Sequence, residues 1–325
     1  MQNLTAVITG VGKALPEKRL TNADLEKMVE TSDEWISKRV GIKERRMAAD
    51  GEWTSHLAAR AAKDALAMSG IPAEQIDLII VSTTTPDTLY PSVACLVQQA
   101  IGAVNAGAMD VAAACTGFIY ASGTAWAMIK SGLMKHVLVI SAEVVTSTTD
   151  WTDRDTCVLF GDGAGAAVFS ASGDGTAGIL SMKLQADGNY SDILKLPNSG
   201  SRTFPEYPGR FIKMQGNDVF KHAVRDMTEC ASDVIAAAGL TMDDVSLFIP
   251  HQANIRIIDA IATRLNMPKE KVFVNIEHYG NTSSATIPIA ICEAVEQGRL
   301  KSGDVLVIDA FGAGLTWGAM AIRWK

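Results

Sequence analysis

Residues 64–81 read DALAMSGIPAEQIDLIIV, and residues 233–250 read DVIAAAGLTMDDVSLFIP. The two stretches align without a gap at an offset of 169 residues. Each contains a helix end, a Gly at the position that follows a helix, an acidic turn and an apolar strand. Self-similarity of this kind indicates that one α/β unit occurs twice in the chain.

Two further pairs of segments extend the repeat. Residues 131–140 (SGLMKHVLVI) are similar to residues 297–308 (QGRLKSGDVLVI), and residues 160–169 (FGDGAGAAVF) are similar to residues 311–320 (FGAGLTWGAM). Short apolar strands that alternate with helices are typical of parallel sheets covered by helices. The sequence therefore predicts two similar α/β halves, 1–170 and 171–325, joined through a Gly-, Pro- and Ser-rich segment that forms a surface excursion.

The composition excludes several classes of protein. Of the 325 residues, 48% are apolar and 20% are charged, which is enough for a large core and unlike a disordered chain. The net charge of −7 disfavours a nucleic-acid partner, because such proteins are usually basic. We find no signal-peptide pattern and no apolar run long enough to cross a membrane, so we expect a soluble, cytoplasmic protein without a membrane partner.

The five cysteines are scattered and include no C-x-x-C pair. Zinc ribbons and disulfide frameworks are therefore not expected, and we predict no metal site. By default each cysteine is a small buried apolar residue.

Cys115 is the exception, because it lies where a strand at about Met109 to Ala113 meets a helix from about Cys115 to Lys130. The positive end of a helix dipole stabilises a thiolate, so we expect a lowered pKa for this thiol and free N–H groups that can hold an oxyanion. A packed structural cysteine is the alternative.

Two other polar residues follow predicted strands in the second half. His251 comes directly after the strand of residues 247–250, and Asn281 follows a Gly after the strand KVFVNI at residues 271–276. The carboxyl ends of parallel strands are where active-site residues gather. A structural His and an ordinary turn Asn are the alternatives, but a Cys, a His and an Asn at three strand ends fit nucleophilic acyl transfer with carbanion stabilisation.

At these residues the chain resembles the β-ketoacyl-[acyl-carrier-protein] synthase III family. The resemblance rests on an ordered set of motifs that spans nearly the whole chain: SDEWISKRVGIKERR at 32–46, DVAAACTGF around Cys115, FGDGAGA at 160–166, PHQANIR at 250–256, YGNTS at 279–283 and FGAGLTWG at 311–318.

The resemblance implies a thiolase-like fold with five α-β-α-β-α layers, a homodimer, and a catalytic triad of Cys115, His251 and Asn281. It implies an acyltransferase that starts fatty-acid synthesis: Cys115 takes a short acyl group, expected to be acetyl, from acyl-CoA. Malonyl-[acyl-carrier-protein] then loses CO2 and its carbanion attacks the acyl-enzyme. The CoA thioesters are substrates, and no cofactor is expected. The oxyanion hole is expected at the backbone N–H groups of Cys115 and Ala313, where some members have Gly at the second position.

Further binding residues follow from the same resemblance. The expected CoA-binding residues are Trp35, Arg39, Arg154, Gly216, Asn217 and Phe220, with the adenine held between Trp35 and Arg154. The expected carrier-protein contacts are Gln252, Ala253, Asn254, Ile255, Arg256, Lys221 and Arg264, in a patch made lighter by Thr263 at a usual Lys position. The expected acyl pocket contains Phe160 and Tyr90, the latter reaching across the dimer where many members have Phe.

Alternative functions remain open at this point. A relative from secondary metabolism would use the same triad with another acyl donor or acceptor, or would only transfer acyl groups. A catalytically silent partner subunit would lack the nucleophile, which is present here. A thiolase proper needs a second cysteine near the last Gly-rich turn, and FGAGLTWG has none.

Overall fold

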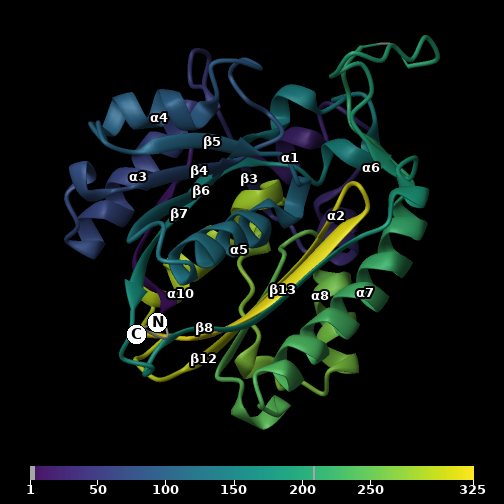
Figure 1. Cartoon of the computed structure of the whole chain (residues 1–325). Helices are drawn as coiled ribbons and strands as arrows, with labels where there is room; N and C mark the ends of the chain where they lie inside the picture. Colours follow the sequence, from purple (N-terminus) through teal and green to yellow (C-terminus); the bar gives the residue numbers. More distant parts are fainter. Residues whose placement is uncertain (1–3, 208) are drawn as a thin grey trace.

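The computed structural model describes residues 4–207 and 209–325, and its core is a pair of β-sheets (Figure 1). The first sheet has the strand order β1-β7-β6-β4-β5, and the second has the order β11-β12-β13-β8. The first set of strands is β1 (Thr5–Ala14), β4 (Leu78–Ser82), β5 (Gly107–Val111), β6 (His136–Val144) and β7 (Asp162–Ser172). The second set is β8 (Gly178–Ala186), β11 (Leu247–Pro250), β12 (Val305–Gly312) and β13 (Thr316–Arg323).

The sequence repeat falls on strands that occupy equivalent places in the two sheets. Strands β8, β13, β12 and β11 follow one another as β1, β7, β6 and β4 do, with two antiparallel pairings and then a parallel one. The first repeat ends on β4 and β11, the second on β6 and β12, and the third on β7 and β13. The counterpart of β5 is reduced to a single parallel bridge between Phe248 and Val272.

Both sheets are mixed, so the prediction of parallel sheets is wrong in part. Strands β12 and β13 are antiparallel and are joined by only three residues, a length that cannot cross over a sheet. The parallel pairings are confined to β6, β4 and β5 in one sheet and to β12 and β11 in the other. The sheet changes at residues 173–177, between β7 and β8, close to the predicted boundary at residue 170.

Helices separate and cover the sheets to give five layers, α-β-α-β-α (Figure 1). One apolar cluster joins the first sheet to α3 and α4, and another joins the second sheet to α7 and α8. Between the sheets, α5 and α10 contribute to a third cluster with strands of both halves. The helices are α3 (Thr54–Ser69), α4 (Val93–Ile101), α5 (Gly117–Lys130), α7 (Gly216–Ala237), α8 (Ile255–Arg264) and α10 (Thr286–Glu296). The layered arrangement predicted from the sequence is confirmed.

Small residues let the outer layer approach the first sheet closely. A Cβ atom added at Gly12 of β1 would lie 2.3 Å from the carbonyl oxygen of Ala61 in α3. Ala61 and Ala65 form the facing side of the helix, and both are fully buried. This contact explains the alanine-rich sequence of α3, since larger side chains would hold the helix away from the strand.

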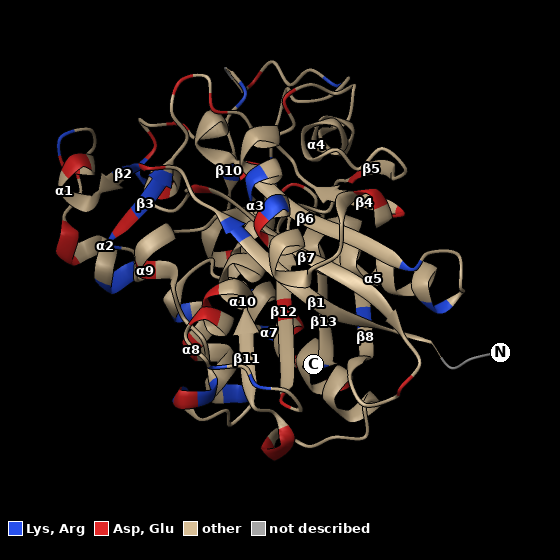
Figure 2. Ribbon diagram, turned by 90° about the vertical axis from the view of Figure 1, so that its left-hand side faces the viewer, with Lys and Arg blue, Asp and Glu red and all other residues tan. Residues whose placement is uncertain are grey.

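Shorter elements form the rim beside the carboxyl ends of the strands. They are β2 (Lys18–Thr21), α1 (Asn22–Leu25), α2 (Asp33–Val40), β3 (Glu44–Met47), α6 (Arg154–Cys157), β9 (Leu194–Lys195), β10 (Lys213–Met214) and α9 (Ile276–Tyr279). Charged residues gather on the outer helices and loops and on the short strands β2 and β3, and the strands of the two central sheets are largely free of them (Figure 2). In the part of the chain that the structure describes, no helix is both long and apolar enough to cross a membrane.

Candidate active site

A cavity of about 420 Å³ opens at the rim where the two halves meet. Cys115, His251 and Asn281 all line it, together with Ala313. The sequence placed these residues at separate strand ends, and the fold brings them to one cavity. The nucleophile comes from the first half and the other two side chains come from the second.

Cys115 lies in a 3₁₀ turn, η2 (Ala114–Thr116), between β5 and α5. The regular helix begins two residues later than predicted, at Gly117. Ala114 has a φ of 44°, a left-handed conformation that costs a residue with a side chain of order 1 kcal/mol or more. This sharp turn presents the thiol at the cavity. Gly117 is required behind it, since a Cβ atom there would lie 1.7 Å from Ser82 Oγ.

The thiol of Cys115 is not activated in the way that the sequence suggested. Burial raises its pKa to about 12, and the nearby Glu143 carboxylate adds to the rise. A hydrogen bond with Ser283 acts in the opposite direction but is weaker than the effect of burial. A helix N-terminus is worth about 1 kcal/mol, which is less than one pKa unit. The prediction of a lowered pKa for Cys115 is therefore wrong.

His251 is buried, and hydrogen bonds fix its backbone and one nitrogen of its ring. Its backbone N–H donates to the Asp309 carbonyl at 2.7 Å, and its Nδ1 lies 2.7 Å from Thr286 Oγ1. When the Thr286 hydroxyl donates to Nδ1, the neutral ring carries its proton on Nε2, the nitrogen that remains for the cavity. Burial lowers the pKa of His251 to about 3, so the ring is a neutral hydrogen-bond donor at physiological pH.

Asn281 is held by hydrogen bonds from both halves of the chain. Its N–H donates to the Leu159 carbonyl at 2.8 Å, and its own carbonyl accepts from Gly161 N at 3.1 Å. Its Oδ1 accepts from Ser283 N at 2.8 Å, which leaves the side-chain NH₂ as the group that can donate into the cavity. The predicted strand at residues 271–276 is wrong: only Val272 pairs with the sheet, and α9 precedes Asn281.

The predicted oxyanion hole lies where the end of β12 touches the nucleophile turn. A Cβ atom at Gly312 would lie 2.8 Å from Cys115 N, so the two backbones are in contact there. Ala313 follows directly and lines the cavity. It does not adopt a positive φ, so its methyl group causes no backbone strain at a position where some family members have Gly.

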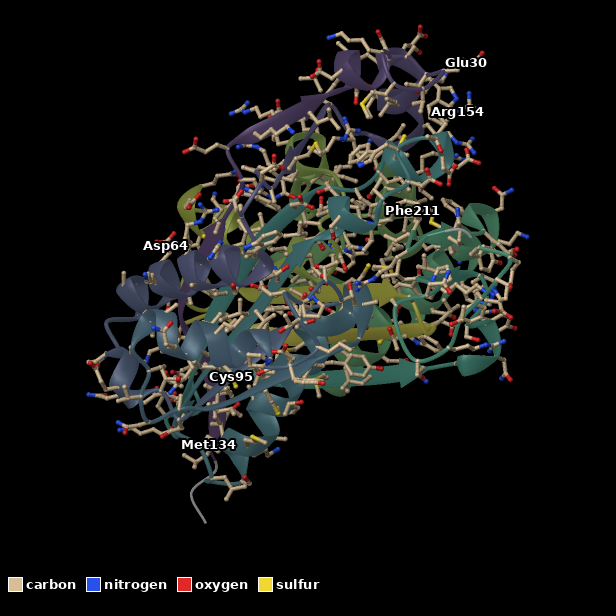
Figure 3. All side chains as sticks on the ribbon, turned by 90° about the horizontal axis from the view of Figure 1, so that it is seen from above. Glu30, Asp64, Cys95, Met134, Arg154 and Phe211 are labelled. Atoms are coloured by element: carbon tan, nitrogen blue, oxygen red, sulfur yellow. The ribbon has the colours of Figure 1, made fainter. Side chains whose placement is uncertain are left out.

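Most of the predicted CoA-binding residues line the cavity or its mouth. Those that line it are Trp35, Arg39, Gly216, Asn217 and Phe220. Arg154 lies beside them at the rim, next to Glu30, whose carbonyl accepts from its Nη1 at 3.2 Å (Figure 3). Its guanidinium is 5.0 Å from the centre of the Trp35 ring. Trp35 is in α2, which is capped by the Ser32 side chain.

The predicted carrier-protein contacts divide into surface and buried residues. Lys221, Arg256 and Arg264 are exposed, and Ala253 and Asn254 line the cavity. Ile255 is half-buried. Gln252 is 1% exposed: its NH₂ donates to the Pro250 and Phe273 carbonyls, and its Oε1 accepts from Asn275 N. Gln252 therefore braces the loop that carries His251, and its prediction as a direct contact with a protein partner is wrong.

The two predicted acyl-pocket residues lie in different places. Phe160 lines the cavity, but Tyr90 is 86% exposed and is not among the lining residues.

All five cysteines are free, with Cys95 on the surface and Cys157, Cys230 and Cys292 buried. Within residues 4–207 and 209–325, no group of three His, Cys, Asp or Glu side chains could hold a metal ion.

The sequence interpretation missed three residues behind the triad: Ser283, Thr286 and Glu143. Ser283 and Thr286 lie within or next to the motif that carries Asn281, but nothing in the local pattern indicates which groups they contact. Glu143 could have been noticed, because it is the one acidic residue in the otherwise apolar strand HVLVISAEV at residues 136–144. A buried, unpaired carboxylate is costly, so its presence in such a strand indicates a function or a dense set of hydrogen bonds.

Comparisons with known proteins show which family the chain belongs to. The chain matches the family models for 3-oxoacyl-[acyl-carrier-protein] synthase III over residues 109–188 and for its C-terminal part over residues 235–324. It is 52% identical to β-ketoacyl-[acyl-carrier-protein] synthase III from Roseiflexus castenholzii, with 98% of each chain covered. It is also 52% identical to the protein of that name from Bacillus pumilus, with 99% of each chain covered.

A solved structure extends the likeness to three dimensions. The crystal structure of 3-oxoacyl-[acyl-carrier-protein] synthase III from Aquifex aeolicus superimposes with a TM-score of 0.93 at 50% identity, covering 98% of this chain and 100% of that one. Sequence and fold thus agree over the whole length, and this chain belongs to the β-ketoacyl-[acyl-carrier-protein] synthase III family.

Proposed function

We propose that the protein catalyses the initiating condensation of fatty-acid synthesis. It is an acyltransferase that joins a short acyl-CoA to malonyl-[acyl-carrier-protein] and releases CoA, CO2 and β-ketoacyl-[acyl-carrier-protein]. The observation that carries this proposal is the meeting of Cys115, His251 and Asn281 around one cavity. The relatives that are about 50% identical over the full chain carry the name of the same enzyme.

The chemistry has two stages. Cys115 attacks the acyl thioester, and the backbone N–H groups of Cys115 and Ala313 hold the oxyanion that develops. Decarboxylation of the malonyl group then gives an enolate, whose oxygen needs hydrogen-bond donors that are not strong acids. His251, kept neutral by the burial that lowers its pKa to about 3, and the side-chain amide of Asn281 supply such donors.

Intact-protein mass spectrometry tests this proposal. We expect acetyl-CoA to add one acetyl mass at Cys115, and malonyl-[acyl-carrier-protein] then to remove it with release of CO2. If only longer or branched acyl groups load, or if another acceptor is needed for discharge, the protein is a relative from secondary metabolism. If loading occurs without any condensation, it is an acyltransferase only.

We also propose that acyl-CoA binds along Trp35, Arg39, Gly216, Asn217 and Phe220, with Arg154 at the adenine end. An adenine ring held between an indole and a guanidinium contacts each of them at about 3.5 Å, so the two groups must lie about twice that distance apart. The present 5.0 Å between Arg154 and Trp35 is too short for that. Adenine binding therefore requires Arg154 to leave the Glu30 carbonyl and move outward, which its exposed position permits.

Replacing Arg154 with Ala should raise the KM for acyl-CoA by about 3- to 30-fold, since stacking on a guanidinium is worth about 0.5–2 kcal/mol. Steady-state kinetics in which each substrate is varied in turn measures this effect. The KM for malonyl-[acyl-carrier-protein], which has no adenine, is the internal control and should stay unchanged. An equal rise in both KM values would place Arg154 outside the adenine site.

The acidic carrier protein is proposed to bind at Lys221, Arg256 and Arg264, which are exposed beside the cavity mouth. Arg256 stacks on Phe220, which lines the cavity, at 5.6 Å and so joins this patch to the proposed pantetheine path. Lys221 is paired with Asp218 at 3.2 Å, so its charge is partly offset. Charge reversal at Arg256 should raise the KM for the carrier protein more than that for acyl-CoA, and the opposite order would contradict this assignment.

A homodimer is proposed on the basis of apolar surface around Tyr90. Leu89 and Tyr90 are 79% and 86% exposed on neighbouring positions, which is unusual unless a partner covers them. Light scattering should give twice the chain mass, and a single-chain mass would contradict the dimer.

We further propose that the enzyme needs no cofactor and works in the cytoplasm, where its five free cysteines stay reduced. Cell fractionation, and the assay of dialysed, chelator-treated enzyme, test these two points.

A further inference from the structure

The Cys115 thiol, which is half-buried and lines the cavity, must lose its proton before the sulfur can attack a thioester. In the structure this thiol donates to Ser283 Oγ, with 3.6 Å between sulfur and oxygen. Ser283 Oγ in turn donates to Glu143 Oε1 at 3.1 Å. A continuous path of two hydrogen bonds therefore runs from the reacting sulfur to a carboxyl group.

Glu143 lies at the end of β6 and is fully buried, with hydrogen bonds to both of its oxygens. Its Oε1 accepts from Ser283 and from Ser284, the latter at 3.0 Å. Its Oε2 accepts from Thr84 N at 3.0 Å and from hydroxyl groups of Thr83, Thr84 and Thr85. The Thr85 hydroxyl accepts from Val144 N, so its own proton points to Glu143.

These donors suit an ionised carboxylate, which can only accept. Burial acts in the opposite direction and raises the pKa of Glu143. Among the described residues no Lys or Arg forms an ion pair with it. The hydrogen bonds favour the charged form and the surroundings favour the neutral form, and a group in that balance can take up a proton and release it again.

His251 does not fill the role of base for the thiol. Its Nδ1 is engaged by Thr286, and burial lowers its pKa to about 3, so it has little affinity for a proton. In the described part of the chain, the hydrogen bond of the Cys115 thiol goes to Ser283 and not to the imidazole.

We propose that Ser283 and Glu143 form a proton relay that accepts the Cys115 proton while the sulfur attacks acyl-CoA. This inference rests on the proposed function and adds residues to its first stage. Ser283 contacts the reacting sulfur and is the catalytic member. Glu143 does not touch the sulfur: it acts through Ser283, whose hydroxyl it positions and whose proton it takes up.

Every bond and proton is accounted for when the relay operates over one acyl transfer. The S–H bond of Cys115 breaks and its proton moves to Ser283 Oγ, while the Ser283 hydroxyl proton moves to Glu143 Oε1. The sulfur forms a bond to the carbonyl carbon, and the oxyanion is held by backbone N–H groups. When the bond from that carbon to the CoA sulfur breaks, the proton returns through the same two oxygens to the leaving thiolate. Acyl-CoA and thiol have then become acyl-enzyme and CoA.

Of the titratable groups near Glu143, Cys115 is the one that is connected to it by hydrogen bonds through Ser283. From β7, Asp162 lies opposite Val144, but its carboxylate accepts from the amides of Ala48 and Thr146. Helices α3 and α5 pack on β6, and their charged and titratable side chains do not bond Glu143. Lys130 of α5 is exposed, and so are those of α3: His56, Arg60, Lys63 and Asp64. The hydroxyl of Tyr120 in α5 donates to the Gln185 carbonyl.

Single-turnover acylation of Cys115 by acetyl-CoA, followed by intact mass from about pH 6 to about pH 10, tests the relay. Replacing Ser283 with Ala should slow acylation near pH 7 by on the order of 100-fold, the usual effect of losing a general base. The deficit should shrink as the pH approaches the pKa of the thiol, because hydroxide then removes the proton. Glu143→Gln should show the same pH dependence.

Ser147→Ala is the matched control. Ser147 is exposed just after β6, and its hydroxyl donates to the Val144 carbonyl and not to Glu143 or Cys115. This variant should keep the acylation rate within about threefold, with an unchanged pH profile. Thermal melting shows whether Glu143→Gln is folded; if it is not, Ser283→Ala alone decides. An unchanged rate for Ser283→Ala, or a deficit that is the same at every pH, would overturn the relay.

Alkylation by iodoacetamide separates this inference from the proposed function. The reagent needs only a thiolate, so Cys115 should be alkylated more slowly at neutral pH in Ser283→Ala whatever acyl group the enzyme uses. The exposed Cys95 in the same molecule is the internal standard and should react equally in all variants. Slower alkylation at Cys115 without acetyl loading of the wild type would refute the substrate and support the relay. Equal alkylation would refute the relay.

Discussion

Replacing Cys115 with Ala should abolish acyl-enzyme formation and lower kcat/KM for condensation by at least about 10⁴-fold. Loss of a nucleophile has the largest effect of any single change at a covalent active site, because no neighbouring group replaces it. The other four cysteines lie on the surface or within the core and cannot take its place. Intact mass after incubation with acetyl-CoA measures the result directly.

Cys95→Ala is the control for that experiment, since Cys95 is exposed and is not among the residues that line the cavity. It should load acetyl at the wild-type rate. An acetyl adduct retained by Cys115→Ala would mean that another residue is the acyl acceptor, and the assignment of the whole site would fail.

Replacing His251 or Asn281 with Ala separates the two stages of the reaction. Each variant should discharge the acyl-enzyme about 100- to 1000-fold more slowly with malonyl-[acyl-carrier-protein], the usual cost of one lost oxyanion donor. Acylation should fall by less than about tenfold, because neither side chain shares the hydrogen bond of the thiol. Rapid-quench mass spectrometry of the loading and discharge steps measures both rates.

Equal loss of both steps would contradict the enolate role. The pH dependence gives a second check on the state of His251. Burial lowers its pKa to about 3, so the ring is neutral at every pH well above that value. The discharge rate should therefore show no acidic limb from His251 between about pH 5 and pH 8. A limb near pH 6.5 that vanishes in His251→Ala would show that the ring titrates normally.

Much of the architecture was predictable because the same α/β unit occurs twice in the chain. The repeated segments, read as helix, turn and strand, locate β4, β6 and β7 and their partners β11, β12 and β13. Strand direction was less accessible, because the periodicity of an apolar strand is the same in both kinds of sheet and only the three-residue connection from β12 to β13 reveals the antiparallel pairing. The single bridge at Val272 shows a similar limit, since an apolar run does not reveal whether a neighbouring strand is there to pair with it.

The three residues that meet at the cavity were predictable from their motifs, and only in part from the repeat. His251 directly follows a repeated strand, whereas Cys115 and Asn281 lie outside the repeated segments. The pKa of Cys115 and the buried position of Gln252 were not predictable, because both depend on residues that are distant in the sequence. These are Glu143 and Ser283 for Cys115, and Phe273 and Asn275 for Gln252. Desolvation is a property of the assembled site, and residues from distant parts of the sequence decide it.

The backbone contact between Gly312 and Cys115 has a consequence for engineering. Because the main chains of β12 and the nucleophile turn touch, main-chain packing sets the distance between the amides of Cys115 and Ala313. A side chain of the acyl pocket that lines the cavity, such as Phe160, can then be exchanged to accept other acyl groups while the machinery for thioester attack keeps its spacing. The fold thus separates what the enzyme recognises from how it reacts, and libraries that vary the first should leave the second intact.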